Sequence, residues 1–331
     1  MSIDRRQFLK GALASGVAMT AATPSSSEAR DNLTMPPKAM GLLYDSTLCI
    51  GCKACVAACK ESNGLPPEFS SSVPEQLWDT PLDLSGKTKN VIKMYRNGTG
   101  EKKDVEENGY AFMKHSCLHC VDPSCVSACP VSAMKKDAET GIVTYDEHDC
   151  IGCRYCVAAC PFDVPRFQYD RPFPKIVKCE LCRHLKEGEN KTRFEYSACA
   201  QVCPTGATLY GPTAELKAEA ERRLALKPGQ ETTYPRGKIG GKDSYQGKVG
   251  SYVQHLYGEK ELGGTQVLKL SAVSFEKLGM RTLPERSFAS VSETMQHSLY
   301  GYLITPVVVL GGLAYAAKRS LGDEGTTDQD Q

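Results

Sequence analysis

Sixteen cysteines constrain this chain of 331 residues more than any other feature, because they form four groups of four and none is left over. The first and third groups repeat almost letter for letter, as CIGCKACVAAC and CIGCRYCVAAC, so they predict two copies of one local structure. In chain order the groups are Cys49/Cys52/Cys55/Cys59, Cys117/Cys120/Cys125/Cys129, Cys150/Cys153/Cys156/Cys160 and Cys179/Cys182/Cys199/Cys203.

The spacing Cys-x2-Cys-x2-Cys, with a fourth cysteine after three more residues, is typical of thiolates that bind cubane 4Fe-4S clusters. One tight loop can then reach three iron corners, and the small residues Gly51 and Gly152 let backbone N–H groups approach the sulfides. Proline follows the last cysteine in three groups, whereas Lys60 follows Cys59 in the first group. The sequence therefore predicts iron–sulfur clusters and a chain that carries electrons.

In two-cluster bacterial ferredoxins the fourth cysteine of each group ligates the neighbouring cluster. Groups two and three adjoin in the sequence and would exchange ligands in this way, and groups one and four would then pair across the chain. We expect four 4Fe-4S clusters, with iron bound by all sixteen cysteines. Site 1 is Cys49, Cys52, Cys55 and Cys203; site 2 is Cys117, Cys120, Cys125 and Cys160; site 3 is Cys150, Cys153, Cys156 and Cys129; site 4 is Cys179, Cys182, Cys199 and Cys59.

Other uses of the cysteines fit the sequence less well. Zinc ribbons use Cys-x2-Cys pairs but rarely three cysteines at this spacing, and cysteines three apart in a tight loop pair poorly as disulfides. We find no nucleotide-binding loop, no Ser/His/Asp constellation and no molybdenum or nickel site. We therefore expect no catalytic residue and a non-catalytic subunit. The alternative to an electron carrier is a protein of a different functional class, a scaffold that metal stabilises and that carries no electrons.

The N-terminus has the form of a twin-arginine export signal. Arg5 and Arg6 precede a short, weakly apolar run, Gly11 to Ala22, and the small residues Ser27 and Ala29 suit a signal peptidase that cuts after Ala29. This route exports folded proteins, which suits a chain whose clusters are inserted in the cytoplasm. We expect residues 1–29 to be a twin-arginine signal peptide; a Sec signal or an ordinary basic N-terminus is the alternative.

The longest apolar run lies near the other end, from Leu299 to Ala317, and contains no charge. It is long enough to cross a bilayer as a helix, and the basic pair Lys318-Arg319 that follows favours the cytoplasmic side. The sequence thus predicts a transmembrane helix over 299–317, a cytoplasmic tail over 318–331 and a periplasmic body. A buried core helix is the alternative.

The predicted fold class is α+β, with tandem bacterial-ferredoxin-like modules of two 4Fe-4S clusters each, long loop insertions and one C-terminal transmembrane helix. The four-cluster region covers residues 41–211, with groups two and three at 110–170 as one module and groups one and four as the other. Residues 212–298 are expected to form a helix and an extended arm. In detail, we expect mostly loop over 61–109, a strand over 142–145, an amphipathic helix over 213–226, loop over 228–264 and a strand over 267–275.

The formal net charge of +1 gives no reason to expect a nucleic-acid partner. A cubane with four thiolates adds a charge of roughly −2, so the loaded protein would be anionic. We expect most lysines and arginines near the cysteines to be solvated surface.

Over nearly its whole length the chain resembles the four-cluster ferredoxin-type subunits of periplasmic-facing respiratory oxidoreductases, and among them the iron–sulfur subunits of bacterial hydrogenase 2. The cysteine groups, the twin-arginine start and the C-terminal apolar run carry the resemblance. So do the segments 44–49, 107–110, 137–144, 223–229 and 255–260.

This resemblance implies partners that the residues alone do not indicate. One partner would be a nickel–iron hydrogenase, with its small and large subunits, and the other an integral membrane, quinone-reactive subunit. This chain would carry electrons between the two. The chain would lie at the periplasmic face of the bacterial inner membrane. The same electron-transfer role for a molybdopterin oxidoreductase is the alternative.

Overall fold

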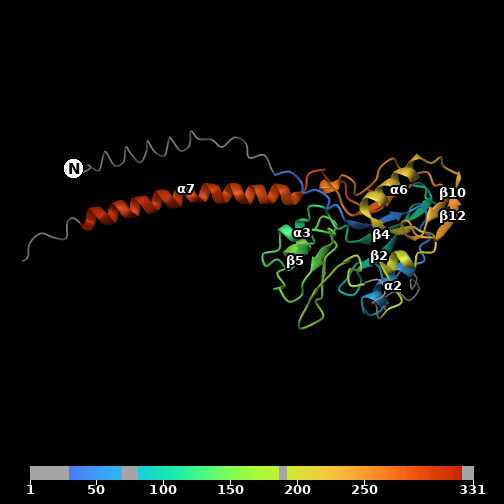
Figure 1. Ribbon diagram of the computed structural model, residues 1–331, viewed down its shortest axis with the longest axis horizontal. Helices are drawn as coiled ribbons and strands as arrows, with labels where there is room; N and C mark the ends of the chain where they lie inside the picture. Colours follow the sequence, from blue (N-terminus) through green and yellow to red (C-terminus); the bar gives the residue numbers. More distant parts are fainter. Residues whose placement is uncertain (1–29, 69–80, 186–191, 323–331) are drawn as a thin grey trace, which may run out of the picture. The chain divides into compact units, whose positions relative to one another are not determined.

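The computed structural model describes residues 30–68, 81–185 and 192–322 (Figure 1). The chain divides into two compact units, one formed by Met1–Asp31 with Ser290–Gln331 and the other by Asn32–Ala289. All sixteen cysteines belong to the second, which we call the cysteine unit. The predicted signal peptide and the end of the predicted tail, residues 323–331, lie outside the described residues.

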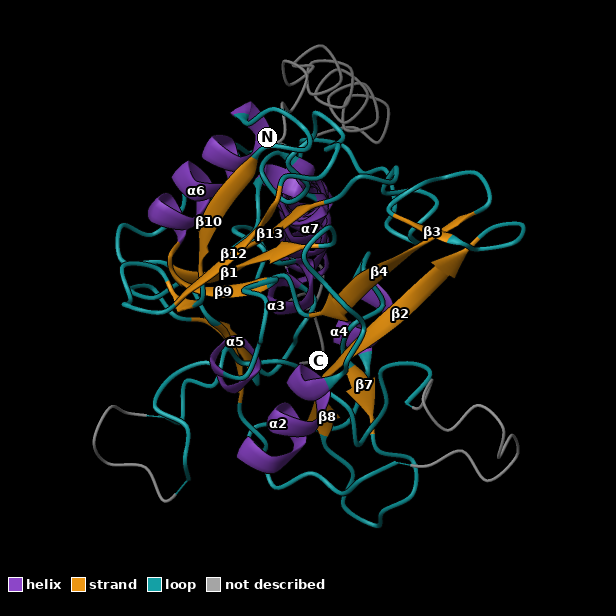
Figure 2. Cartoon of the chain, turned by 90° about the vertical axis from the view of Figure 1, so that its right-hand side faces the viewer, coloured by secondary structure: helices purple, strands orange, loops and turns teal. Residues whose placement is uncertain are grey.

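Short strands and helices make up the cysteine unit, and the long helix α7 begins at its end (Figures 1 and 2). The strands are β1 (Met40–Asp45), β2 (Asn90–Arg96), β3 (Lys102–Lys103), β4 (Gly109–Ser116), β5 (Met134–Lys136), β6 (Val143–Tyr145), β7 (Arg166–Phe167), β8 (Ile176–Val177), β9 (Thr208–Pro212), β10 (Glu231–Pro235), β11 (Gly237–Lys238), β12 (Ser244–Lys248) and β13 (Val267–Leu270). The helices are α2 (Ala54–Ser62), α3 (Ser124–Ser127), α4 (Tyr155–Ala159), α5 (Ala198–Gln201), α6 (Thr213–Ala225), the 3-10 helix η2 (Glu261–Gly263) and α7 (Phe288–Gly322).

The main sheet has the strand order β11-β9-β1-β13. β1 pairs antiparallel with β9 and parallel with β13, so Leu43 lies opposite Leu209 on one side and Leu268 on the other. These three leucines pack against Leu216 of α6, whereas Leu42 and Tyr44 belong to a core group that contains cysteines. Alternate residues of β1 therefore face α6 and the cysteines in turn, as the period of a strand requires.

The same arrangement of a short helix pair beside an antiparallel strand pair occurs twice. In one copy α2 contacts α5, and β1 pairs with β9. In the other copy α3 contacts α4, and β5 pairs with β6. The first copy joins segments that lie far apart in the chain and carry cysteine groups one and four, and the second joins the segments of groups two and three.

Two segments that the sequence suggested were mostly loop contain paired strands. In residues 61–109, β2 pairs with β4 over its whole length, from Asn90 opposite Ser116 to Arg96 opposite Tyr110. In residues 228–264, β10 and β12 form an antiparallel pair. Both segments are still mostly loop among the described residues, as predicted, but the sequence missed these strands because the pairing partner that stabilises each one cannot be seen from local composition.

The segment after residue 212 also differs from the expected arm. The helix is present as α6, but β13 ends at Leu270, earlier than the predicted strand 267–275. β13 is hydrogen-bonded to β1, and β11 to β9. Both strands therefore complete the main sheet instead of extending away from the cysteine-rich core.

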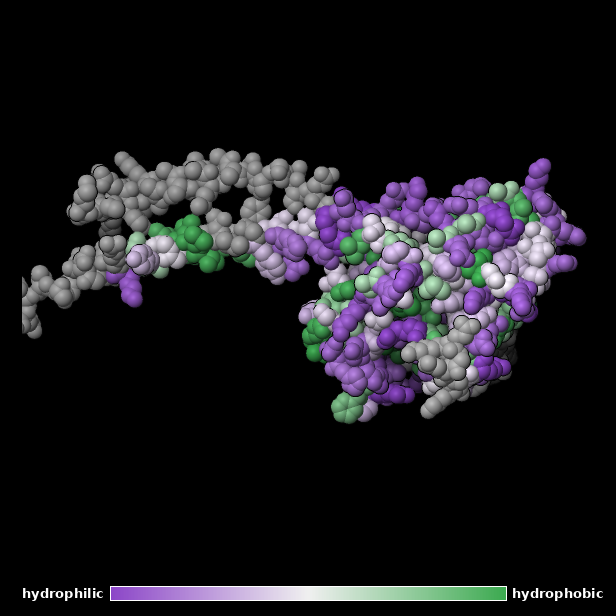
Figure 3. All heavy atoms as spheres, viewed as in Figure 1, coloured by the Kyte–Doolittle hydropathy of each residue, from purple (hydrophilic) through white to green (hydrophobic). Residues whose placement is uncertain are grey.

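The 35-residue helix α7 covers the predicted transmembrane segment and contains Pro306. Apolar side chains lie along its middle (Figure 3), and Val307, Val308 and Leu310 are 67%, 63% and 64% exposed. Among the residues whose side chains are described, no helix combines the length and apolar character needed to cross a membrane. The side chains at positions 301, 302, 304 and 305 of the predicted span are outside the described residues. The predicted transmembrane helix is therefore not supported.

Candidate metal centres

The two repeated cysteine loops have the same backbone conformation. Gly51 and Gly152 both have φ of +72°, and two residues later Lys53 and Arg154 have φ of +55° and +64°. Each loop then enters a helix, α2 or α4, one residue further on. Left-handed residues are costly for side chains with a Cβ, so their recurrence shows that the loop geometry is imposed by the repeated sequence.

Backbone N–H groups point at cysteine sulfurs in several of these loops. Such hydrogen bonds stabilise negative charge on sulfur, as thiolate ligands of a metal require. The donor–Sγ pairs are Gly152–Cys150 at 3.4 Å, Leu181–Cys179 at 3.4 Å and Thr208–Cys203 at 3.5 Å.

All four cysteines of predicted site 1 line one pocket. It contains about 330 Å³ of empty space, and its walls include Cys49, Cys52, Cys55 and Cys203 together with apolar groups such as Ile92. Cys203 lies far from the other three in sequence and comes to them because β9, which follows it closely, pairs with β1. A cavity lined by four sulfurs and little other polar surface suits a cluster that needs thiolates and exclusion of water.

Some cysteines of the other predicted sites also share core groups with members of their own site. Cys117 packs with Cys160, both from site 2, and Cys156 packs with Cys129 and Cys150 of site 3. Three further contacts join neighbouring sites. Cys199 and Cys179 of site 4 pack with the site 1 cysteines, Cys179 also packs beside Cys117 of site 2, and Cys125 of site 2 packs beside Cys156 of site 3.

The cysteines are all free, so the structure gives no support to a disulfide framework. Within the described ranges, no group of three or more His, Cys, Asp or Glu side chains converges on a point that would hold one metal ion. Ligands of a four-iron cluster surround a larger volume than ligands of a single ion do, and the site 1 pocket has that form.

Burial makes the thiolate form of these cysteines unfavourable without a cation. It raises the pKa of Cys59 to about 12, with a further contribution from the nearby Cys199 and Cys182. It also raises the pKa values of Cys156 and Cys160, each to about 11. A metal bound by these sulfurs would supply the positive charge that keeps them deprotonated.

Two buried lysines lie beside the cysteines, contrary to the expectation of solvated surface. Lys114 and Lys178 are each 2% exposed, and neither forms an ion pair with Asp or Glu among the described residues. Burial lowers the pKa of Lys114, but the Cys199 and Cys55 thiolates outweigh burial and raise it. A buried ammonium without a carboxylate is costly, so these lysines fit sites that carry net negative charge.

Sequence reasoning missed these lysines for an identifiable reason. Lys178 directly precedes Cys179, which is a usable signal, but nothing near Lys114 in the sequence indicates a cysteine site. Lys114 lies in β4, and only the tertiary packing that puts its neighbour Met113 in one core group with Cys55 and Cys199 brings it to cysteines from groups one and four.

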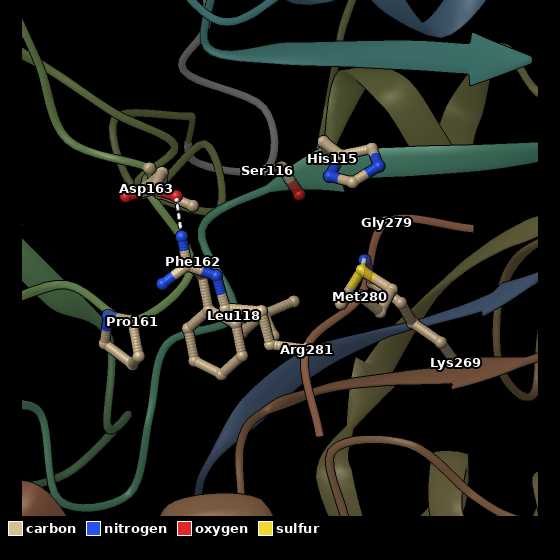
Figure 4. A pocket seen from close by; sticks show the side chains of 11 residues that line it. His115, Ser116, Leu118, Pro161, Phe162, Asp163, Lys269, Gly279, Met280 and Arg281 are labelled. Carbon is tan, nitrogen blue, oxygen red and sulfur yellow. Dashed lines mark hydrogen bonds and ion pairs between the residues drawn. The ribbon is translucent and has the colours of Figure 1, made fainter. Parts of the chain in front are cut away.

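A second pocket, with about 370 Å³ of empty space, borders site 2 (Figure 4). Its walls include the neighbours of Cys117 and Cys160, and Arg281 donates a hydrogen bond of 2.7 Å to Asp163 there. His115 also lines it. Burial, with the charges of Lys269 and Lys93, lowers the pKa of His115 to about 3, so the ring is neutral. The pocket therefore lies beside site 2, and no cysteine lines it.

The other histidine near site 2 also has a packing role. His119 is fully buried, and its Nδ1 accepts a hydrogen bond of 3.0 Å from the backbone N–H of Val143. Burial and the charges of Lys178 and Lys136 hold the pKa of His119 well below its usual value. A neutral ring that joins two backbone segments needs no role at a metal.

Comparison with known families supports this interpretation of the cysteines. Residues 48–133 and 109–213 each match a model described as a 4Fe-4S dicluster domain. Residues 2–22 match the signal sequence of the twin-arginine translocation pathway. The tandem ferredoxin-type prediction and the export-signal prediction are both confirmed by these matches.

Curated relatives cover nearly the whole chain. The hydrogenase-2 operon protein HybA of Escherichia coli O157:H7 is 48% identical over 319 residues, which is 96% of either chain. This chain belongs to the HybA family. A protein of Nitratidesulfovibrio vulgaris is 36% identical over 298 residues, 86% of this chain. The nitrate-inducible formate dehydrogenase iron–sulfur subunit of Escherichia coli strain K12 is 36% identical over 187 residues, 55% of this chain.

Membership of the HybA family confirms the resemblance seen in the sequence. With two dicluster domains, this HybA-family chain is an iron–sulfur electron-transfer subunit and not a catalytic one. The count of four clusters and the ligands of each stay predictions.

Proposed function

We propose that this HybA-family chain carries electrons through four 4Fe-4S clusters, bound at sites 1 to 4, between a nickel–iron hydrogenase and a quinone-reactive membrane subunit. The single observation that carries the proposal is that the sixteen cysteines of the sequence, fifteen of them buried or half-buried, divide into four sets, one of which lines a common pocket. When bound, such clusters supply reversible one-electron chemistry, and their potentials depend on charge, hydrogen bonds to sulfur and exposure.

The contacts between sets support a linear order of sites, 1–4–2–3. Site 1 shares a core group with site 4, site 4 contacts site 2 through Cys179, and site 2 contacts site 3 through Cys125. No core group joins site 1 to site 3 in the described part of the chain. Electrons would thus enter at one of these two sites and leave at the other.

Exposure supports sites 1 and 3 as the two ends. Cys52 of site 1 is exposed, and the neighbouring Ile50 is 55% exposed. At the equivalent place in the repeat, Ile151 and Tyr155 beside site 3 are 66% and 61% exposed. Exposed apolar side chains at a redox site suit the docking of a partner, because they can exclude water between two centres.

Location at the periplasmic face of the inner membrane is part of the proposal. The twin-arginine signal supports export. The charge-free run Leu299–Ala317 and the exposed apolar side chains of α7 support attachment, since such a surface is normally covered by lipid or protein. The hydrogenase partner is supported by the name of the hydrogenase-2 operon protein HybA, which aligns with this chain over 96% of its own length.

A molybdopterin oxidoreductase is the competing partner. The formate dehydrogenase iron–sulfur subunits favour it only through the central part of the chain, because they align with about half of it. Isolation of the intact complex from membranes would separate the two: a co-purifying nickel–iron subunit supports the hydrogenase, and a molybdopterin subunit contradicts it.

The electron-transfer proposal is tested by metal analysis and spectroscopy of the anaerobically purified chain. We expect about sixteen iron and about sixteen sulfide ions per chain, and EPR signals of reduced four-iron clusters that titrate with potential. A protein containing zinc in place of iron, or iron that cannot be reduced, would show that the cysteines serve a structural purpose.

A further inference from the structure

The buried ammonium group of Lys114 connects sites 1 and 4. Its strand neighbour Met113 packs in one core group with Cys199 of site 4 and Cys55 of site 1. Against the effect of burial, the charges of these two sulfurs raise the pKa of Lys114. Its Nζ also lies 3.5 Å from Oγ1 of Thr208, whose backbone N–H donates a hydrogen bond of 3.5 Å to the Sγ of Cys203 in site 1. One lysine therefore lies beside sulfurs of both sites and reaches a sulfur of site 1 through a single residue, Thr208.

The surroundings keep this charge from being neutralised by the protein. Lys114 is 2% exposed, and no Asp or Glu in the described ranges forms an ion pair with it. A second buried lysine, Lys269, donates a hydrogen bond of 2.7 Å from its Nζ to the carbonyl oxygen of Lys114. Because the ammonium group is buried and has no carboxylate partner in the described ranges, its electric field at the sulfurs of sites 1 and 4 is only weakly screened.

A fixed positive charge favours the more negative form of a redox centre. Reduction adds one electron and no proton to the centre, so its charge becomes more negative by one unit. An ammonium group in a low-dielectric interior stabilises that reduced form more than the oxidised form, which raises the reduction potential.

We propose that Lys114 is a potential-setting residue shared by sites 1 and 4, and that it raises the reduction potentials of the centres bound there above those they would have without it. This inference rests on the proposed function. It assigns no such role to Lys114 at site 3, whose cysteines pack with Met134, Val143 and Ile176 and not with β4.

The test is an EPR-monitored redox titration of the full chain, comparing wild type with Lys114→Met. Two of the four transitions should move to lower potential, with at least a tenfold fall in the ratio of reduced to oxidised centre at a fixed potential, which is about 59 mV for a one-electron couple. The other two transitions should stay in place, and the iron content should be unchanged.

Matched variants decide whether charge is the cause. Lys114→Gln keeps a hydrogen-bond donor but removes the charge, so it should shift the same two transitions, whereas Lys114→Arg should restore them. Lys135→Met removes a lysine that is half exposed and paired with Asp149, and it should leave all four transitions unmoved.

Three results would overturn the proposal: unchanged potentials in both uncharged variants, an equal shift of all four transitions, or loss of iron from both, which would make Lys114 a packing residue. Failure of the proposed function itself looks different, because the wild-type chain would then show no reducible four-iron clusters before any variant is compared.

Discussion

At the scale of single residues, the pairing of cysteines between distant groups is the most testable feature. Cys203 and Cys199 belong to one sequence group but to different predicted sites, whereas Cys203 and Cys52 belong to different groups but line the same pocket. The two pairs therefore give opposite expectations when their members are removed together.

Changing Cys203 to Ala should remove one cluster, about a quarter of the iron. Adding Cys52→Ala should cost no further iron, because both residues serve site 1. Adding Cys199→Ala should roughly double the loss, because a second site then lacks a ligand. Iron analysis with EPR spin counting measures both. If the pair Cys203 and Cys52 loses more iron than the pair Cys203 and Cys199, the crosswise exchange of ligands is wrong.

At the scale of elements, a buried ionic network fastens α6 to the main sheet. Arg223 is fully buried, and its guanidinium donates to Asp45 of β1 at 3.0 Å and to Glu219 of α6 at 2.8 Å. The same group lies 5.0 Å from the ring centroid of Tyr234, and Tyr252 donates to Asp45 at 2.7 Å. Because β1 leads directly into the first cysteine loop, this network also holds the position of site 1.

We expect Arg223→Met to destabilise the cysteine unit by about 3–5 kcal/mol, since it leaves the buried Asp45 without its cation and Glu219 with only Arg222. Arg222→Met is the matched control. Arg222 pairs with Glu219 as well but is 39% exposed, so its loss should cost at most about 1 kcal/mol. Chemical denaturation followed by circular dichroism measures both, and equal effects would contradict a special role for the buried arginine.

The same network predicts how acid changes the stability of the cysteine unit. Burial raises the pKa of Glu219, but the hydrogen bond from Arg222 and the charge of Arg223 outweigh burial and hold that pKa below its usual value. A depressed folded-state pKa contributes stability that is present above the unfolded value, about 4.3, and is lost as pH falls through the folded value. The network therefore weakens only in acid and contributes fully at neutral pH.

At the scale of the whole molecule, the cysteine unit and most of the C-terminal helix belong to different compact units. The unit Asn32–Ala289 contains every cysteine, whereas most of α7 belongs to the other unit. Metal binding and attachment to a membrane or partner should therefore be separable by truncation.

A chain that ends at Ala289 and retains its export signal should keep its full iron content and be released from washed membranes. The comparison is the full chain, expressed without its candidate partner subunits so that they cannot retain it. Iron analysis and fractionation measure the two outcomes. Loss of iron on truncation would contradict the independence of the cysteine unit, and release of the full chain would contradict attachment through α7.

The sequence by itself determined the local features, the cysteine loops and their chemistry, because at sites 1 and 3 three ligands lie within seven residues of one another and short-range spacing fixes their geometry. It also indicated α6 and the strand at β6, whose patterns are local. It missed β2, β10 and β12, because the partner strand that stabilises each of them cannot be read from local composition.

Only the tertiary structure decided which distant groups meet. The pairing of β1 with β9 brings Cys203 into the pocket of Cys49, and β13 turns an expected arm into part of the main sheet. Packing of β4 also buries Lys114 beside sulfurs from two sites. These contacts join residues far apart in the chain, and their free energy comes from burial and hydrogen bonds that no local pattern records.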